Sequence, residues 1–258
     1  MTGRCRARRN VGGKSVSINY GKLTSIALDP IEKKPLACFC PGSLILSVGS
    51  FGCNMDCPFC QNDSISMAAE NEAPTKFMPP SMLAACAERL RDEGNIGVAY
   101  TYNEPLIGWE YVRDTAKEVR ARGMKNVAVT NGCFCRDTLE EVLPWIDAYN
   151  IDLKGFTEEY YQKLGGDLET VKEFIREAVS HAHVEVTTLI VPDENDAPEE
   201  IHELSLWLAS IGKDIPLHIT RFFPRRKMLD KSPTDAGLLY RLADEAGKSL
   251  SRVFVGNV

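Results

Sequence analysis

The chain has 258 residues and a formal net charge of −6 at pH 7, an acidic balance that argues against broad binding to nucleic acid or anionic membranes. No apolar run approaches the ~18 residues of a membrane span, and no apolar segment follows the basic start, so neither a membrane protein nor a secreted protein is expected. Nine cysteines in a cytoplasmic protein are expected to be thiols or metal ligands. The start of the chain is expected to be a solvated, frayed terminus, although it carries Arg4, Arg6, Arg8 and Arg9.

Residues 1–42 are predicted to be an irregular, β-rich lead-in, and residues 43–258 a core in which strands and helices alternate. The apolar and β-branched runs predict strands at 44–48, 96–101, 127–130, 148–153, 184–191 and 217–220, with a terminal strand at 253–255. The helical spacings predict helices at 81–92, 106–122, 137–143, 158–164 and 168–180, and two more that begin near 196 and 232. Expected helix ends are N-caps at Ser81, Asp196 and Ser232 and a terminating glycine at Gly123.

Six strands alternating with helices predict an α/β fold with a parallel sheet and right-handed crossovers. Six units are too few for an eightfold barrel, so the expected architecture is a partial (βα)6 barrel of the TIM type, with a β-rich extension at its start. In such barrels the chemistry lies at the C-terminal ends of the strands.

Polar residues collect where the predicted strands end, which indicates one shared site. The second strand ends in Thr101-Tyr102-Asn103-Glu104-Pro105, the third in Thr130-Asn131-Gly132 and the fourth in Asp152-Leu153-Lys154. The sixth contains His218 and Arg221. Each group alone has an ordinary structural explanation, such as a helix-start acid or a strand-end ion pair, but their joint placement favours function.

The first strand leads directly into Cys53-Asn-Met-Asp-Cys57-Pro-Phe-Cys60. Three thiolates at this spacing can hold three irons of a [4Fe–4S] cube and leave the fourth iron open. The alternative is a structural zinc site, for which Cys38 or Cys40 would supply the fourth ligand. Of the other cysteines, Cys86 is expected in the core, and no role is assigned to Cys5, Cys133 and Cys135.

A cysteine loop of this kind after the first strand of a partial barrel resembles the radical S-adenosylmethionine superfamily. The aromatic Phe59 before the third cysteine is similar to the pattern of glycyl-radical-enzyme activases, and the pyruvate formate-lyase activase group shows motifs like Thr130-Asn131-Gly132 and Asp152-Leu153-Lys154. The similarity is closest to the subfamily called AmmeMemoRadiSam, whose members show stretches like Tyr20-Gly21-Lys22, Asp29–Pro35, Phe51–Asn54, Cys60–Asn62, Tyr102–Pro105, Glu185–Leu189 and Val255–Asn257.

The resemblance implies a role for each site residue. Cys53, Cys57 and Cys60 would ligate the cluster, and S-adenosylmethionine would chelate its open iron. Reductive cleavage of the cofactor would yield a 5′-deoxyadenosyl radical, which abstracts hydrogen from a substrate. Asp152 and Lys154 are implied as catalytic and cofactor-binding residues. Further contacts with the cofactor are implied for Phe59, Tyr102, Asn103, Glu104, Thr130, Asn131 and His218, and Arg221 is a weaker candidate for an anionic contact.

The substrate stays open at this stage. An activase acts on a backbone glycine of a partner enzyme, whereas the subfamily name points to a small molecule or peptide handled with Memo-like and AMMECR-type proteins. The chain departs from activases at Tyr102-Asn103, which replace two glycines, at Val129, which replaces an aspartate, and at Thr187, which replaces an arginine. An external one-electron donor of the flavodoxin or ferredoxin type is implied. A non-catalytic iron–sulfur or zinc protein is the alternative of another class.

Overall fold

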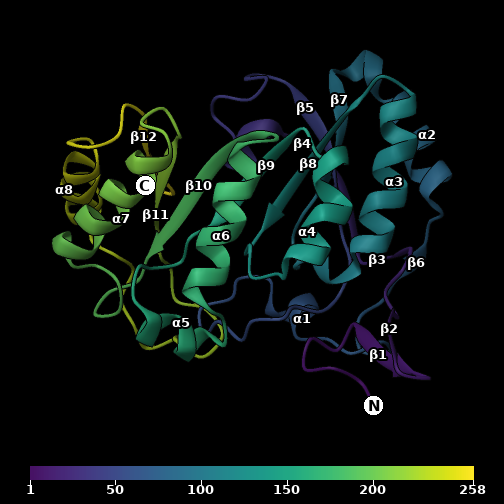
Figure 1. Cartoon of the computed structure of the whole chain (residues 1–258), viewed down its shortest axis with the longest axis horizontal. Coiled ribbons are helices and arrows are strands. Elements are labelled where there is room, and N and C mark those ends of the chain that lie inside the picture. The colour runs from purple at the N-terminus through teal and green to yellow at the C-terminus, as the bar shows by residue number, and fades with distance from the viewer.

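The computed structural model describes all 258 residues, and its central feature is one curved sheet of eight strands (Figure 1). The strand order is β12-β11-β10-β9-β8-β7-β5-β4. Only β4 runs antiparallel to its neighbour, and every other adjacent pair is parallel. The strands are β4 (Ser25–Pro30), β5 (Leu44–Gly49), β7 (Asn95–Tyr100), β8 (Lys125–Thr130), β9 (Ala148–Asp152), β10 (His183–Ile190), β11 (Leu217–Arg221) and β12 (Val253–Gly256).

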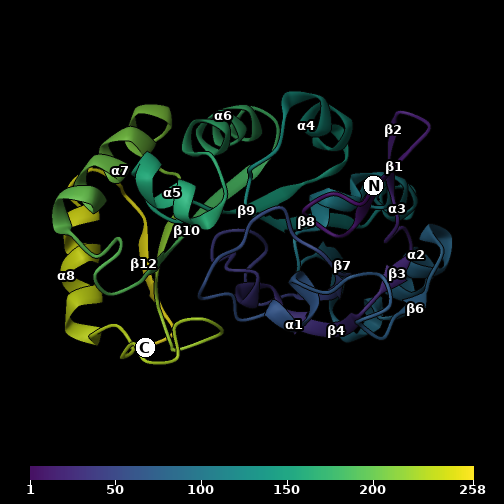
Figure 2. The ribbon, with the colours of Figure 1, turned by 90° about the horizontal axis from the view of Figure 1, so that it is seen from below.

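Helices cover the outer, convex face of this sheet, as Figure 2 shows. The longer ones are α2 (Pro80–Arg89), α3 (Trp109–Ala121), α4 (Arg136–Val142), α5 (Glu158–Leu164), α6 (Leu168–Val179), α7 (Pro198–Ile211) and α8 (Ala236–Ala246). The short elements are α1 (Asp63–Ser66) and four 3-10 turns, η1 (Ile31–Lys33), η2 (Arg91–Glu93), η3 (Pro105–Gly108) and η4 (Leu143–Trp145). Two small antiparallel pairs, β1 (Arg8–Val11) with β2 (Lys14–Ser17) and β3 (Lys22–Leu23) with β6 (Lys76–Phe77), complete the chain. The expected partial (βα)6 barrel is confirmed.

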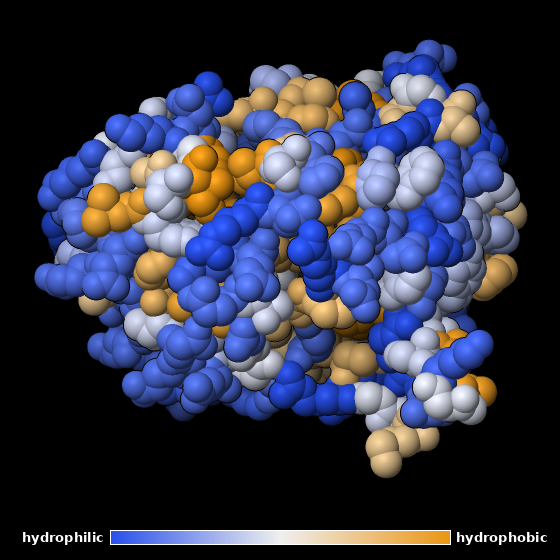
Figure 3. Space-filling view, in the orientation of Figure 1, coloured by the Kyte–Doolittle hydropathy of each residue, from blue (hydrophilic) through white to orange (hydrophobic).

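The main core lies between the sheet and this helical layer. Helix α6 is typical: Leu168, Val171, Phe174, Ile175 and Ala178 recur at helical spacing and are all buried. Phe174 packs edge-on against Tyr149 of β9, with 5.8 Å between ring centroids. The face seen in Figure 3 is mostly hydrophilic with a few apolar patches. None of the helices has the length and apolar character needed to cross a bilayer.

Three predicted helix caps are wrong, and prolines explain two of them. Pro80 and Pro198 occupy the first turns of α2 and α7, and the residue before a proline is held in an extended conformation. The N-caps are therefore Pro79 and Ala197, in place of Ser81 and Asp196.

The third cap is displaced by an anchor to the sheet. The hydroxyl of the buried Thr234 donates to the carbonyl of Ile190 in β10, at 2.6 Å. Helix α8 therefore starts at Ala236, two residues after this anchor, with Asp235 in place of Ser232 as the N-cap that accepts from the Leu238 amide. The predicted end of α3 is confirmed, since Gly123 follows it with φ +67°.

The lead-in does not lie outside the sheet. Strand β4 pairs with β5, and Ile31 and Leu36 are fully buried in a small core formed with Ile45, Ala99, Val127 and Ala148 of the sheet. These sheet residues share the inner, concave face. The segment after β4 therefore closes the inside of the partial barrel.

The frayed, solvated terminus expected for the first nine residues is wrong. Ala7 is fully buried. The Arg8 guanidinium donates a hydrogen bond to each carboxylate oxygen of Glu110, at 2.7 and 2.9 Å. Arg4 donates to the carbonyls of Asn54 and Gly165, at 2.7 and 2.5 Å. The basic side chains therefore fasten the start of the chain across the loop that carries the cysteines.

Asp29 provides a test of how the lead-in is held. Lys34 is buried and donates to Asp29 at 2.8 Å, whereas Lys33 is 66% exposed and lies 3.6 Å from the same carboxylate. Although burial opposes it, hydrogen bonds from Lys34 and Tyr102 lower the pKa of Asp29 from 3.8 to about 2.

We predict that Lys34→Met lowers the free energy of unfolding by about 2–3 kcal/mol, because it leaves the half-buried Asp29 carboxylate without its buried cation. Lys33→Met, the matched control, should change it by about 0.5 kcal/mol or less. Because the pKa of Asp29 is depressed in the folded state, its contribution is present above about pH 4 and lost towards pH 2. Urea unfolding of both variants checks this, and equal effects of the two substitutions would contradict it.

Candidate active site

The cysteine loop leaves β5 at the C-terminal edge of the sheet and is fixed at its start by Asn103. The Asn103 side chain accepts from the Ser50 amide at 2.8 Å and donates to the Gly52 carbonyl at 3.0 Å. Gly52 has φ +93°, and a Cβ there would lie 2.5 Å from the Cys5 carbonyl oxygen. Only glycine therefore fits between the start of the chain and Cys53.

The three thiols of the loop lie in protected surroundings. Cys57 is buried, Cys53 and Cys60 are half-buried, and all nine cysteines are free. Burial raises the pKa of Cys53 to about 12 and that of Cys57 to about 11, so cluster assembly has to displace their protons. No group of three His, Cys, Asp or Glu side chains is arranged to hold a single metal ion. In a [4Fe–4S] cube each thiolate binds a different iron, so the ligands surround the cluster.

Glu104 joins the ends of two strands. Its buried carboxylate accepts hydrogen bonds from the Thr130 hydroxyl at 2.8 Å, the Asn131 amide at 2.7 Å and the Leu106 amide at 3.0 Å. Burial nevertheless raises the pKa of Glu104 to about 7, since no cation of the chain pairs with it. A bound ammonium group would supply the missing positive charge.

Asn131 carries this network on to the cysteine loop. Its side-chain amide donates to the Asn54 side-chain oxygen at 2.8 Å and lies 3.8 Å from the Cys53 sulfur. Asn54 in turn donates to the Cys133 carbonyl at 2.7 Å. Four predicted site residues, Cys53, Glu104, Thr130 and Asn131, therefore lie in one connected set.

Asp152 and Lys154 form an ion pair of 2.8 Å at the end of β9. Burial disfavours the charged lysine, but Asp152 and Cys57 outweigh it and raise the pKa of Lys154. The lysine is therefore a fixed positive charge beside the cysteine loop. Its backbone is held at the amide by the Tyr161 hydroxyl, at 3.0 Å, and at the carbonyl by Asn195, at 2.7 Å.

His218 lies in the same row of the sheet as Asp152. The parallel register sets Asp152 of β9 beside Thr187 of β10, and Thr187 beside His218 of β11. Neighbours in register point to the same face, so this row spans the concave side of the barrel. The ring of His218 stacks on Phe254, with 5.2 Å between centroids.

The remaining predicted residues are less directly connected to this set. Tyr102 has φ +71°, a conformation that favours glycine, and its hydroxyl donates to Asp29 at 2.7 Å, so its side chain lies against the lead-in. Phe59 is buried in the main core. Arg221 donates to the Thr234 carbonyl at 2.7 Å, which gives it a structural partner.

The structure does not place Cys38 or Cys40, the predicted fourth ligands of a zinc site, with the cysteine loop. Cys38 donates its amide to Glu185, near the start of β10, and Cys40 lies just before the start of β5. Both cysteines are therefore at the amino ends of the strands, whereas the cysteine loop follows the carboxyl end of β5. Neither forms a metal-binding group with Cys53, Cys57 and Cys60 in this structure.

Three residues that support the site received no role from the sequence. Asn54 bridges the cysteine loop to β8, Glu185 holds His218, and Asn195 binds Val191, Lys154 and Leu189 through one side chain. Glu185 carried a detectable signal, because an acidic residue within a buried strand needs paired partners. Asn54 carried none beyond the Phe51–Asn54 stretch.

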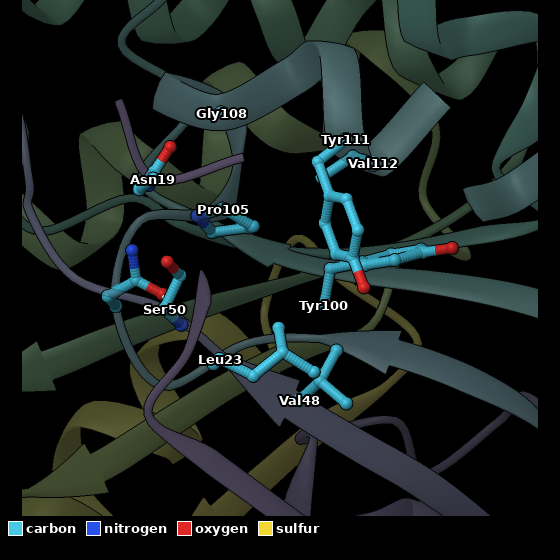
Figure 4. A pocket seen from close by; sticks show the side chains of 11 residues that line it. Asn19, Leu23, Val48, Ser50, Tyr100, Pro105, Gly108, Tyr111 and Val112 are labelled. Carbon is cyan, nitrogen blue, oxygen red and sulfur yellow. Dashed lines mark hydrogen bonds between the residues drawn. The ribbon is translucent and has the colours of Figure 1, made fainter. Parts of the chain in front are cut away.

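A small cavity lies behind the site, between β5, β7 and α3 (Figure 4). Its water-accessible volume is about 30 Å³, close to that of one water molecule. Tyr100, Tyr111, Pro105 and Leu23 line it, and Asn103 forms part of its wall. The cavity is on the helical side of the sheet and too small for a cofactor.

Comparison with known proteins identifies the family. The sequence model of the radical SAM superfamily matches residues 47–205, which is more than half of the chain. The protein therefore belongs to the radical SAM superfamily. It is 38% identical over 261 residues to MJ0808 of Methanocaldococcus jannaschii, an uncharacterized protein, and the match covers 99% of this chain and 76% of MJ0808.

Solved structures confirm the fold. SuiB of Streptococcus suis bound to S-adenosylmethionine has a TM-score of 0.63 at 15% identity, covering 82% of this chain and 51% of SuiB. A domain of the pyruvate-formate lyase-activating enzyme of Bacteroides vulgatus has a TM-score of 0.54 at 18% identity, covering 62% of this chain and 99% of that domain. S-adenosylmethionine and a [4Fe–4S] cluster, the cofactors expected from the sequence, are those of this superfamily.

The residues present fit these cofactors. Three unpaired thiols lie on one protected loop, with a fixed cation at Lys154 and an uncompensated carboxylate at Glu104 nearby. The hydroxyl of Tyr160 in α5 is buried without a hydrogen-bond partner, and the carbonyl at the end of that helix, Leu164, accepts from the amide of Asp56 in the loop. A buried unpaired hydroxyl costs about 1–3 kcal/mol, so a partner supplied by a bound group would stabilise it.

We predict that the cofactor-free protein loses stability as the pH rises from about 5 to 8. The pKa of Glu104 is about 7 when folded, above its unfolded value of about 4.3, so the folded state holds the proton more tightly in this range. The free energy of unfolding should fall by about 3 kcal/mol between these two pH values. Glu104→Gln should remove it, whereas Glu88→Gln on the exposed side of α2 should retain it. Urea unfolding at both pH values measures the difference, and an unchanged slope in Glu104→Gln would refute the assignment.

Proposed function

We propose that the protein reductively cleaves S-adenosylmethionine at a [4Fe–4S] cluster held by Cys53, Cys57 and Cys60, and uses the resulting radical to abstract hydrogen from a substrate. The observation that carries this proposal is the hydrogen-bonded path from Glu104 through Asn131 and Asn54 to the cysteine loop. It ties a carboxylate suited to an ammonium group to the loop suited to the cluster.

Each side chain has a task in this proposal. The three thiolates bind and orient the cluster, and Glu104 binds the amino group of S-adenosylmethionine, a partner that its buried charge lacks within the chain. Lys154, held as a cation by Asp152, binds the cofactor carboxylate or ribose. When bound, the cofactors supply an electron and a 5′-deoxyadenosyl radical. Phe59 and the packed start of the chain keep water from the loop.

The substrate class that we propose first is the backbone glycine of a partner enzyme, as in activases. The Thr130-Asn131-Gly132 and Asp152-Leu153-Lys154 motifs support it. The alternative is a small molecule or peptide handled with Memo-like or AMMECR-type proteins, as for the AmmeMemoRadiSam subfamily. Thr187 favours the alternative: it occupies the position of an activase arginine, and its hydroxyl is bound to Asn150 at 2.9 Å. An external flavodoxin or ferredoxin would supply the electron in either case.

The first test measures 5′-deoxyadenosine after anaerobic reconstitution, reduction and addition of S-adenosylmethionine. We expect product from the wild type and from Cys86→Ala, a control that removes a thiol on α2. Cys57→Ala should give no product above background, because a cluster ligand is lost. A wild-type yield equal to that of Cys57→Ala would refute the proposal and favour a non-catalytic iron–sulfur protein.

A second test separates the two substrate classes. The active protein is incubated with a candidate glycyl-radical enzyme, and electron paramagnetic resonance is recorded. A persistent glycyl doublet that depends on Cys57 is expected for an activase. Turnover of a small molecule or peptide without any doublet would reject the activase assignment.

A further inference from the structure

Glu185 is the most heavily hydrogen-bonded side chain on the concave face, and neither the family comparison nor the proposed function uses it. It is fully buried. One oxygen accepts from the Cys38 amide at 2.7 Å and from His183 at 2.9 Å. The other accepts from the Ala37 amide at 2.9 Å and from His218 at 2.6 Å.

The position of Glu185 in the sheet determines which elements its hydrogen bonds connect. Glu185 precedes Thr187 by two residues on β10, so both side chains point to the concave face and Glu185 lies one step below the row of Asp152, Thr187 and His218. The Ala37 and Cys38 amides come from the lead-in. One carboxylate therefore joins β10, β11 and the lead-in directly beneath the candidate cofactor site.

The bonds also determine which ring nitrogen of His218 carries a hydrogen. A carboxylate can only accept hydrogen bonds. Two of the four donors to Glu185 are backbone amides, which cannot act as acceptors. Although burial opposes ionisation, the four hydrogen bonds lower the pKa of Glu185 to about 2. The Nε2 of His218 must therefore carry a hydrogen, and a neutral imidazole then has its lone pair on Nδ1. Nδ1 makes no hydrogen bond within the chain and is not among the buried polar atoms that lack a partner.

We infer that Glu185 is a positioning residue that locks His218 as the Nε2–H tautomer, so that Nδ1 presents a hydrogen-bond acceptor to a ligand hydroxyl on the concave face. This inference rests on the proposed function for the identity of the ligand, a ribose hydroxyl of S-adenosylmethionine. The tautomer itself does not depend on it. His183 shares the same carboxylate but lies two residues lower on β10 and is partly exposed, so it provides a matched control.

The test uses the reconstituted protein with an oxidised cluster. Nitrogen-15 NMR of the histidine side chains should show His218 as the Nε2–H tautomer in the wild type and in His183→Gln. In Glu185→Gln the negative charge is lost and a donor replaces one of the two oxygens, so the tautomer preference of His218 should weaken in either orientation of the amide and should be lost where the amide nitrogen faces His218. Equilibrium binding of S-adenosylmethionine should weaken about tenfold in Glu185→Gln and less than twofold in His183→Gln.

Two results would overturn the inference. The first is a wild-type His218 with its hydrogen on Nδ1, a measurement that needs no variant and stands even where Glu185→Gln does not fold. The second is a folded Glu185→Gln with wild-type affinity. Failure of the proposed function would give a different result. In that case the wild type would not cleave the cofactor, but the tautomer of its His218 could still be measured.

Discussion

The carboxylate of Glu104 is the contact on which the arrangement of the site depends. It is buried at the end of β7 and is held by the Thr130 hydroxyl and the Asn131 amide from the end of β8. Asn131 then binds Asn54 in the cysteine loop, which follows β5. The hydrogen bonds of Glu104 and Asn131 thus connect the C-terminal ends of three neighbouring strands, β5, β7 and β8. Its uncompensated charge marks the place where a cationic group belongs.

Two further networks shape the concave face around this point. The lead-in enters the barrel from the amino ends of the strands, and two carboxylates hold it there. The half-buried Asp29 binds Lys34 and Tyr102, and the fully buried Glu185 binds two lead-in amides and two histidines. From the opposite side, Arg4 fastens the start of the chain to the cysteine loop. A partial barrel leaves its interior open, and in this protein Ile31 and Leu36 of the lead-in pack against the concave face of the sheet.

Much of the fold followed from local sequence. Each parallel strand was predicted within a few residues of its bounds, because every one is a short apolar, β-branched run beside an amphipathic helix. The predicted caps failed at Ser81, Asp196 and Ser232, where proline geometry and the anchor at Thr234 set the helix starts. The basic first residues looked solvated because their partners, such as Glu110 and the Asn54 carbonyl, are distant in sequence.

The sequence by itself determined the class of protein: the spacing of Cys53, Cys57 and Cys60 and the polar residues after each strand predict a cluster loop on a parallel barrel, and the superfamily and the fold are confirmed. Spacing and periodicity are local properties, so they can be read along the chain. Only the tertiary structure decided which residues support the site around that loop. Asn54, Asn195 and Glu185 each act through at least one partner 33 to 148 residues away, and the pairing of such partners depends on the register of the strands.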